Sequence, residues 1–244
     1  LGDLSAMKKL RISEIFGPTI QGEGALIGKP TVFVRAGGCD YRCSWCDTLY
    51  AVESQFRNEW TPMTSEEIWL KVRTLSNDCP LTISLSGGNP AIQDFSAFIK
   101  IAQSNGYEVA METQGSIHQP WFADLNHLAL SPKPPSAEIS FDKSKFAKCV
   151  QAGPVGKIVM KIVIFDEIDY NWAKEMADLY PDLPLFLQAG NLSHQTQTKS
   201  AKSPFDQSSE KMLWLIEKTL SDNWFKPKIL PQLHVMIWGN ARGV

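Results

Sequence analysis

Three cysteines crowd into one short segment, and their spacing indicates the chemistry that this chain is able to support. Cys39, Cys43 and Cys46 lie within eight residues at the spacing Cys-x3-Cys-x2-Cys. Thiolates are soft ligands that suit iron–sulfur clusters or zinc. Electron-transfer clusters and structural zinc sites are closed by four protein ligands, and no fourth cysteine lies nearby. The triad therefore predicts a four-iron cluster that leaves one iron open to an exogenous ligand.

A zinc site or a chance grouping is the alternative for this loop. Cys79 and Cys149 lie far from the triad in sequence and are expected to be small buried hydrophobic residues rather than ligands. Zinc would need a histidine as its fourth ligand, and no histidine has matching local spacing. The histidines are His118, His127, His194 and His234.

Composition excludes some classes of partner. The chain has 24 Lys and Arg against 26 Asp and Glu, so its net charge is −2, and this balance indicates neither nucleic-acid nor membrane binding. No apolar run approaches the ~18 residues of a membrane-spanning helix. Five cysteines, three of them in one loop, favour a metal site in a reducing compartment over a disulfide framework, so a cytoplasmic location is expected.

Short apolar runs alternate with longer helical patterns, which predicts an α/β protein with a parallel sheet and crossover helices. The length suits a single domain over residues 1–244, with residues 1–6 expected to be a non-native or disordered extension. Thr64 and Glu67 have the spacing of a capping box. The expected strands are 31–36, 81–86, 108–112, 128–131, 157–165 and 183–188. The expected helices are 65–74, 91–103, 168–180 and 204–220.

Nearly every expected strand ends in a polar or glycine-rich turn. Each turn taken alone is adequately explained as a tight connection between a strand and a helix. Parallel strands bring their carboxyl ends to one face, where substrates bind, so the turns together predict a site at that face. These turns are residues 37–39, 86–89, 112–115, 131–133 and 188–191.

The cysteine spacing, with Tyr41 and Trp45 inside it, resembles the signature of the radical S-adenosylmethionine superfamily. This resemblance implies a partial (β/α)6-type barrel, a [4Fe–4S] cluster and S-adenosylmethionine on the open iron. The segment 86–90 resembles the superfamily's GGEP motif, with Asn89 where Glu is commoner. The residues that this resemblance assigns to cofactor binding are Gly88, Ser131, Pro132, Lys133, Gln188, Ala189, Gly190 and Asn191.

Longer motifs narrow the resemblance to one family. Segments 14–24, 32–39, 46–48, 112–115, 131–135 and 238–244 resemble the 7-carboxy-7-deazaguanine synthases. The resemblance implies a lyase that carries out a radical ring contraction of 6-carboxy-5,6,7,8-tetrahydropterin to 7-carboxy-7-deazaguanine, with loss of ammonia, in queuosine and deazapurine biosynthesis. It also implies a homodimer and a reductant of the flavodoxin or ferredoxin type.

The same resemblance suggests roles for individual residues. Arg35 is expected to hold the substrate carboxylate in a fork, the alternative being a strand-end ion pair. Thr48 is placed like the family's Mg²⁺ ligand, with Asp47 in support, the alternative being a helix cap. A free carboxylate at Val244 is expected to reach the substrate, the alternative being a frayed terminus. The expected substrate-binding residues are Ile20, Gln21, Gly22, Glu23, Arg35, Ser86, Glu112 and Val244.

Two other functions compete with this prediction. A glycyl-radical-enzyme activase shares the cysteine spacing but acts on a protein backbone, so it needs an open groove instead of a pterin pocket. A non-catalytic zinc- or cluster-binding module would carry out no reaction. Gln21, Glu23, Arg35 and Thr48 favour the pterin enzyme.

Overall fold

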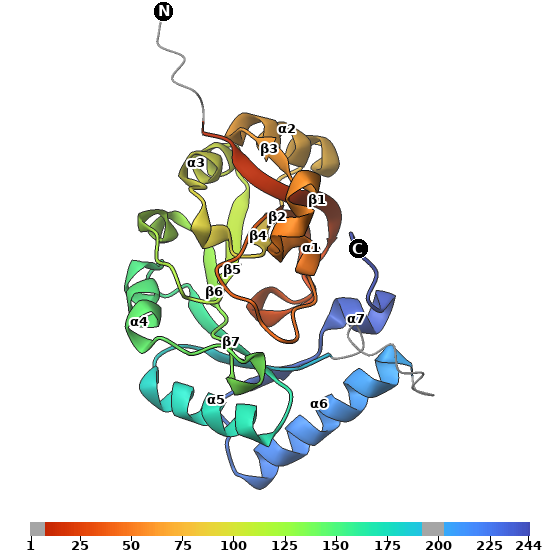
Figure 1. Ribbon diagram of the computed structural model, residues 1–244, viewed down its shortest axis with the longest axis vertical. Helices are drawn as coiled ribbons and strands as arrows, with labels where there is room; N and C mark the ends of the chain where they lie inside the picture. The colour runs from red at the N-terminus through yellow and green to blue at the C-terminus, as the bar shows by residue number, and fades with distance from the viewer. Residues whose placement is uncertain (1–7, 192–202) are drawn as a thin grey trace, which may run out of the picture.

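A single nine-stranded sheet forms the centre of the computed structural model, which describes residues 8–191 and 203–244. The predicted extension at residues 1–6 lies outside the described residues. The strands are ordered β3-β1-β2-β4-β5-β6-β7-β8-β9 (Figure 1). Along this order, every neighbouring pair after β2 is parallel. β1 and β3 add an antiparallel edge. The strands are β1 (Leu10–Ile20), β2 (Pro30–Ala36), β3 (Thr61–Met63), β4 (Thr82–Gly87), β5 (Glu108–Thr113), β6 (His127–Leu130), β7 (Ile158–Ile164), β8 (Leu185–Ala189) and β9 (Lys228–Leu230).

Helices connect the parallel strands, and Figure 1 shows α3, α4 and α5 along the outer side of the curved sheet. None of the described helices is both long and apolar enough to cross a membrane. The α-helices are α1 (Leu49–Val52), α2 (Ser65–Ser76), α3 (Ser96–Ser104), α4 (Lys143–Ala152), α5 (Glu167–Leu179), α6 (Pro204–Ser221) and α7 (Leu233–Trp238). The 3-10 helices are η1 (Gly24–Leu26), η2 (Ser54–Glu59), η3 (Pro90–Ile92), η4 (Pro120–Asp124) and η5 (Pro135–Ala137).

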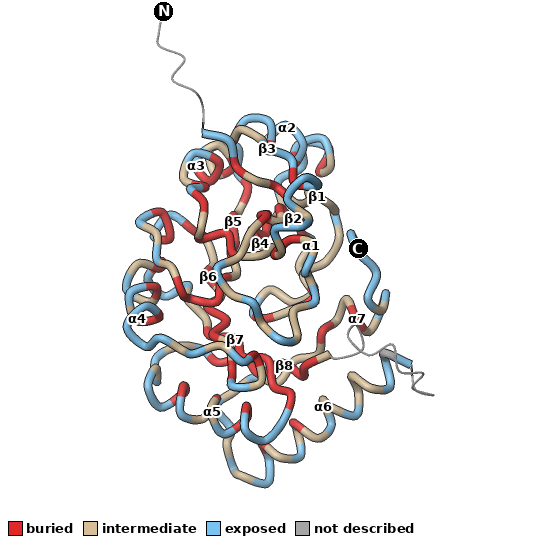
Figure 2. The backbone as a smooth tube through the Cα atoms, in the orientation of Figure 1, coloured by how far each residue is buried: buried red, intermediate tan, exposed pale blue. Residues whose placement is uncertain are grey.

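The core follows the strands, as expected for a parallel sheet that helices cover (Figure 2). Val32 and Val34 of β2 and Ile83 and Leu85 of β4 are fully buried. β7 reads Ile-Val-Met-Lys-Ile-Val-Ile, so a single lysine, Lys161, interrupts an otherwise apolar strand. That residue lies at the candidate site described below.

The predicted fold class is confirmed, and each of the six predicted strands corresponds to a strand from β2 to β8 that differs by one or two residues at its ends. The capping box is also confirmed: Thr64 Oγ1 accepts from the Glu67 amide, and Glu67 Oε2 accepts from the Thr64 amide. The expected helices 168–180 and 204–220 are observed as α5 and α6, and each observed end lies within one residue of the expected end.

The predicted helix 91–103 is wrong in its first turn. Asn89 caps the short helix η3, the chain then extends through Gln93, and α3 begins only at Ser96. The interruption has two visible causes. The Gln93 side chain bonds to the Arg11 backbone, and Asp94 Oδ1 accepts from the Ser96 amide, which starts a new helix.

Several elements were not predicted, chiefly β1, β9, α1, α4 and α7. The prediction for the two remote cysteines is correct for one of them only. Cys149 is a buried residue of α4, whereas Cys79 is exposed in the turn after α2. The glycine and proline residues of β1 obscure its strand pattern, so its sequence indicates a motif but no strand.

Candidate active site

A cavity of about 240 Å³ opens at the carboxyl ends of the parallel strands. Its walls come from the ends of the parallel strands β2, β4, β5, β6, β7 and β8 with the loops that follow them, from the segment that joins β1 to η1, and from α7 with the C-terminal residues. Each of the five predicted strand-end turns contributes at least one residue to the wall of this cavity, so their predicted convergence is observed. One wall carries the cysteine loop and another carries a group of charged side chains.

The three cysteines of the triad all line this cavity. Burial raises the pKa of each thiol, that of Cys43 to about 11, and the positive charge of Lys133 acts in the opposite direction. Lys133 Nζ also lies 5.6 Å from the centre of the Trp45 ring, so a cation stands beside the loop. Coordination to iron would stabilise the thiolate form that burial alone disfavours.

Three cysteine thiols on one cavity wall are a donor set that suits an open iron–sulfur cluster. No three His, Cys, Asp or Glu side chains within residues 8–191 and 203–244 are grouped closely enough to hold one metal ion. A cube of four irons and four sulfides is larger than one ion, so its ligand sulfurs stand further apart. His234 lines the cavity, but it lies on α7 beside Glu23. His194 lies outside the described residues.

One end of the cysteine loop is bound to the neighbouring strand ends through Asp40. Its Oδ1 accepts hydrogen bonds from Asn89 Nδ2 at 2.8 Å and Gln114 Nε2 at 2.7 Å. Asn89 is fully buried, and its Oδ1 accepts in turn from Thr113 Oγ1 and the Ala91 amide. Asn89 in the GGEP-like position thus donates to an acidic partner, where a glutamate would place two carboxylates together.

The other end of the loop is bound through Trp45. Its indole Nε1 donates to Ser136 Oγ at 3.0 Å, and Ser136 Oγ donates to Asp169 Oδ2 at 2.6 Å. Asp169 belongs to α5 and is completely buried. The Ser44 hydroxyl adds a bond to the Ser136 carbonyl. The segment between Cys39 and Cys46 is therefore held at both ends by residues that are remote in sequence.

A buried ionic group forms the opposite wall. Lys161 Nζ on β7 contacts both Glu23, just before η1, and Glu112 at the end of β5, the latter at 2.6 Å. Gln232 Nε2 donates to the second oxygen of Glu23 at 2.8 Å. Burial alone would raise the pKa of Glu23, but the charges of Lys161 and His234 lower it to about 2. Glu23 therefore stays ionised at any physiological pH.

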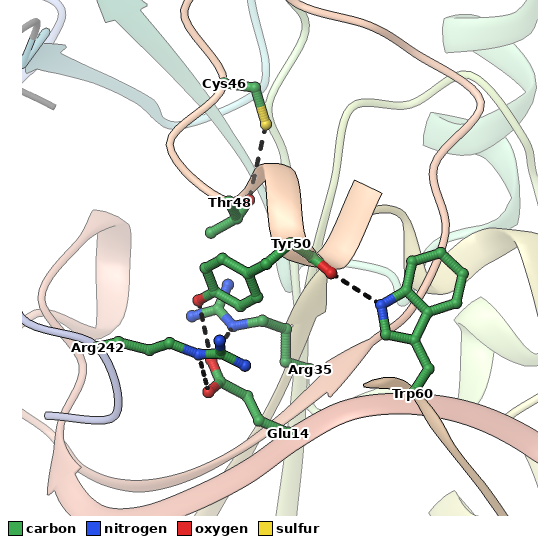
Figure 3. Close-up of polar contacts among 7 residues, drawn as sticks. All are labelled: Glu14, Arg35, Cys46, Thr48, Tyr50, Trp60 and Arg242. Carbon is green, nitrogen blue, oxygen red and sulfur yellow. Dashed lines mark hydrogen bonds and ion pairs between the residues drawn. The ribbon is translucent and has the colours of Figure 1, made fainter. Parts of the chain in front are cut away.

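A second ionic cluster links β1, β2 and the C-terminal segment (Figure 3). Glu14 Oε1 accepts from Arg35 Nε at 2.7 Å and Tyr50 OH at 2.9 Å, while its Oε2 accepts from Arg242 Nε at 2.8 Å. Burial would raise the pKa of Glu14, but these partners, Arg242 first, lower it. The ion-pair alternative for Arg35 is thus observed, and the same guanidinium also lines the cavity, so the two roles are compatible.

Thr48 occupies the N-cap position of α1, but its side chain makes no capping hydrogen bond. Its hydroxyl lies 3.8 Å from Cys46 Sγ and lines the cavity (Figure 3). The helix-cap explanation therefore does not account for the hydroxyl, which remains directed toward the thiols. Asp47 beside it lines the cavity as well.

The predicted substrate-binding residues all line the cavity, from the segment 20–23 to Val244. The predicted cofactor-binding residues divide into two sets. Gly88, Lys133 and Asn191 line it, whereas the other five lie outside its wall. Those five are Ser131, Pro132, Gln188, Ala189 and Gly190.

Unpartnered polar atoms at the strand ends fit the binding of a polar cofactor. Ser86 Oγ and both side-chain polar atoms of Gln188 are buried and have no hydrogen-bond partner among the described residues. Buried polar groups rarely remain unpaired, so such atoms indicate a missing ligand or water. Gln188 is 1% exposed, which places it behind the wall of the cavity rather than on it.

Sequence analysis missed several residues of the site. Lys161 is the most important, and a lone lysine inside an apolar strand was the signal that could have found it. Gln114 lies inside a family motif that predicts no separate role for it, and the sequence suggests His234 only as a zinc ligand. Gln232 carried no sequence signal, because only the position of α7 brings it to Glu23.

The parallel sheet and a three-thiol loop at its carboxyl edge define a radical S-adenosylmethionine enzyme. The chain is 38% identical over 240 residues to the 7-carboxy-7-deazaguanine synthase of Bacillus cereus, covering 98% of this chain and 100% of that one. It is 37% identical to the Bacillus subtilis enzyme of the same name, covering 97% and 99%. The chain belongs to the 7-carboxy-7-deazaguanine synthase family.

Solved structures support the fold. QueE from Escherichia coli superposes with a TM-score of 0.62 at 21% identity, covering 91% of this chain and 93% of that one. Streptococcus suis SuiB bound to S-adenosylmethionine gives a TM-score of 0.52 at 12% identity, covering 82% and 50%. No family model matches the chain.

Proposed function

We propose that the cavity is the active site in which 6-carboxy-5,6,7,8-tetrahydropterin is converted to 7-carboxy-7-deazaguanine with loss of ammonia. Membership of the family supports this reaction. The observation that carries the proposal is that a three-thiol loop and a charged wall line one cavity. The first suits an open cluster, and the second suits a substrate with both N–H donors and a carboxylate.

The cofactor half of the cavity contains Cys39, Cys43 and Cys46, which would hold the [4Fe–4S] cluster. Gly88, Lys133 and Asn191 on the cavity wall would contact S-adenosylmethionine, and the unpartnered hydroxyl of Ser86 on the same wall supports a polar ligand there. When bound, the two cofactors supply the radical chemistry that protein side chains do not provide. The protein's own task is to orient the groups and exclude water. The roles of Ser131, Pro132, Gln188, Ala189 and Gly190 stay predictions.

The substrate half contains the charged residues. Glu23 and Glu112 would accept the N–H donors of the pyrimidine ring, and Gln21, whose Nε2 donates to Ser84 Oγ, would contact the same edge. Arg35 uses Nε for Glu14, which leaves its terminal nitrogens to bind the substrate carboxylate in a fork. The Thr48 hydroxyl would join the coordination of Mg²⁺. The terminal carboxylate of Val244 stays a prediction.

Partners and location complete the proposal. The reaction requires an electron donor, which we infer to be of the flavodoxin or ferredoxin type. All five cysteines are free thiols, which supports a reducing compartment such as the cytoplasm.

Three large apolar residues on α6 are exposed at near-heptad spacing, which supports a homodimer that light scattering would detect. They are Phe205, Leu213 and Leu220. The continuous sheet supports a single domain.

The decisive experiment is an anaerobic assay of the reconstituted protein with carboxytetrahydropterin, S-adenosylmethionine, Mg²⁺ and dithionite. Mass spectrometry should detect 7-carboxy-7-deazaguanine, and a Cys46→Ala variant should form none. Absence of product from wild-type protein with a full complement of iron and sulfide would overturn the proposed function. Formation of a glycyl radical on an added protein substrate would favour the activase instead.

A further inference from the structure

Lys161 is a buried cation that the motifs of the chain do not explain. It lies in the middle of an apolar strand and is 2% exposed. A lysine in such a position costs free energy unless its charge is compensated. The compensation comes from Glu23 and Glu112, which belong to a loop and a strand far away in sequence. β6 lies between β5 and β7, so the lysine side chain joins two strands that do not pair directly.

The three charged groups leave the wall with an excess of negative charge. One ammonium faces two carboxylates, so the group carries a formal charge of −1. One oxygen of Glu23 accepts from Lys161 and the other accepts from Gln232. In Glu112, it is Oε1 that contacts the Lys161 ammonium. Both carboxylates line the cavity. A wall of this kind favours ligands that present adjacent N–H donors.

We propose that Lys161 is a positioning residue for substrate selection, which holds Glu23 and Glu112 in the arrangement that binds the adjacent N–H donors of a 2-amino-4-oxopyrimidine ring. This inference rests on the proposed function, because it concerns how the same cavity chooses its substrate. Lys161 acts through the two carboxylates. Its compact ammonium has no fixed plane, so it contacts carboxylates that approach from two elements.

The electrostatics of the wall support this role. The titratable groups that face Glu23 are Lys161 on β7, Glu112 on β5 and His234 on α7. Burial alone would lower the pKa of Lys161, but Glu112 and Glu23 raise it. Without Lys161, burial and the neighbouring Glu112 carboxylate would both raise the pKa of Glu23. The ionised form of Glu23 would then require a higher pH.

The first test compares Lys161→Met with a matched control, Lys29→Met. Lys29 also pairs with a glutamate, Glu108, but this pair is about half exposed and does not line the cavity. We expect the variant-to-wild-type ratio of KM to be at least about tenfold at neutral pH for Lys161→Met and near one for Lys29→Met. The Lys161→Met ratio should fall as pH rises from 6 to 9, because Glu23 then regains its charge. A ratio near one, or a raised ratio that does not change with pH, would overturn the proposal.

The second test measures binding without turnover, by fluorescence titration with 6-carboxypterin and with 6-carboxylumazine, in which an oxo group replaces the 2-amino group. Wild-type protein should prefer 6-carboxypterin, and Lys161→Met should lose most of this preference. Equal preference in the two proteins would refute the role of Lys161. Because this titration needs no reaction, it separates the inference from the proposed function, which fails if wild-type protein binds the pterin but forms no product.

A variant that retains fewer buried charges guards against misfolding of Lys161→Met. The double variant Lys161→Met/Glu112→Gln removes the ammonium and one carboxylate, so Glu23 is the one charged member of the group that remains. Its preference for 6-carboxypterin should still increase with pH, since Glu23 remains buried without its cation. Iron and sulfide content should match wild type. A pH-independent preference in this variant would also contradict the proposal.

Discussion

At the scale of single residues, the cysteine loop depends on side chains that do not bind the cluster. Asp40 follows the first cysteine and accepts from Asn89 and Gln114, which come from the turns after β4 and β5. Trp45 precedes the last cysteine and bonds to Ser136. Ligand geometry at a metal centre is commonly set by such outer contacts. We therefore expect the two attachments to help set the positions of the thiols.

The first prediction concerns Asp40. Asp40→Ala removes the acceptor of two amide donors, one of them on the fully buried Asn89, and should cost about 1–3 kcal/mol of unfolding free energy. Asp40→Asn retains an acceptor oxygen and should lose much less. Thermal unfolding and iron content after reconstitution measure the two effects. Equal losses in both variants would contradict the hydrogen-bond explanation.

The second prediction concerns Thr48. Its side chain makes no capping bond, so Thr48→Ala should leave the unfolding temperature of the protein without added metal almost unchanged. The same variant should lose most of the stimulation of turnover by Mg²⁺, whereas Thr48→Ser, which keeps the hydroxyl, should retain it. Assays with and without Mg²⁺ make the comparison. A clear drop in unfolding temperature for Thr48→Ala would indicate a structural role instead.

At the scale of elements, α7 completes the substrate wall by docking against the segment before η1. The Leu233 amide donates to the Gly22 carbonyl at 3.0 Å, and Gln232 bonds to Glu23. A Cβ atom at Gly22 would lie 2.2 Å from His234 Nδ1, so only glycine permits this approach. The position of α7 thus depends on the absence of a side chain at one residue.

The third prediction follows from this contact. Gly22→Ala should push His234 and α7 outward and raise the KM for substrate, with cluster content unchanged. Removing the imidazole as well, in Gly22→Ala/His234→Ala, should cost less than the sum of the two single changes, because the collision is gone. Steady-state kinetics of the four proteins measure the coupling. Strict additivity would show that the two residues do not contact each other.

At the scale of the whole molecule, ion pairs connect the two ends of the described chain. Arg242 bonds to Glu14 of β1, and Figure 1 shows the C-terminus beside β1 and α1. Lys161 and Gln232 meet at Glu23. These carboxylates have lowered pKa values because of their cationic partners. Stability should therefore depend on pH through them.

The fourth prediction is loss of stability in acid. The pKa of Glu23 is about 2 in the folded protein against an ordinary value of 4.5, so its contribution is complete above pH 4.5 and disappears as pH falls toward 2. The loss should be on the order of 3 kcal/mol. Glu14 adds to it in the same direction. Urea unfolding from pH 6 to pH 3 should show the decline, and Glu23→Gln should reduce its slope. An unchanged slope would exclude Glu23 as its source.

The sequence by itself determined the features that are local or periodic. The cysteine loop, the strand-end turns and the capping box each occupy a few adjacent residues, so their chemistry is readable from spacing alone. Apolar runs predicted the parallel strands, because strands covered on both faces are continuous in hydrophobicity. The predicted helix 91–103 is wrong in its first turn because Gln93 bonds to the Arg11 backbone and Asp94 caps a new helix at Ser96, contacts that periodicity does not show.

Only the tertiary structure decided which residues meet in the charged wall of the cavity. Lys161 and Glu23 are separated by 138 residues, and Gln232 and Glu23 by 209. No local pattern encodes such pairs, because they depend on the order of strands in the sheet and on where α7 docks. Charge compensation in a buried site requires the partners to meet in space, and the fold alone brings them together.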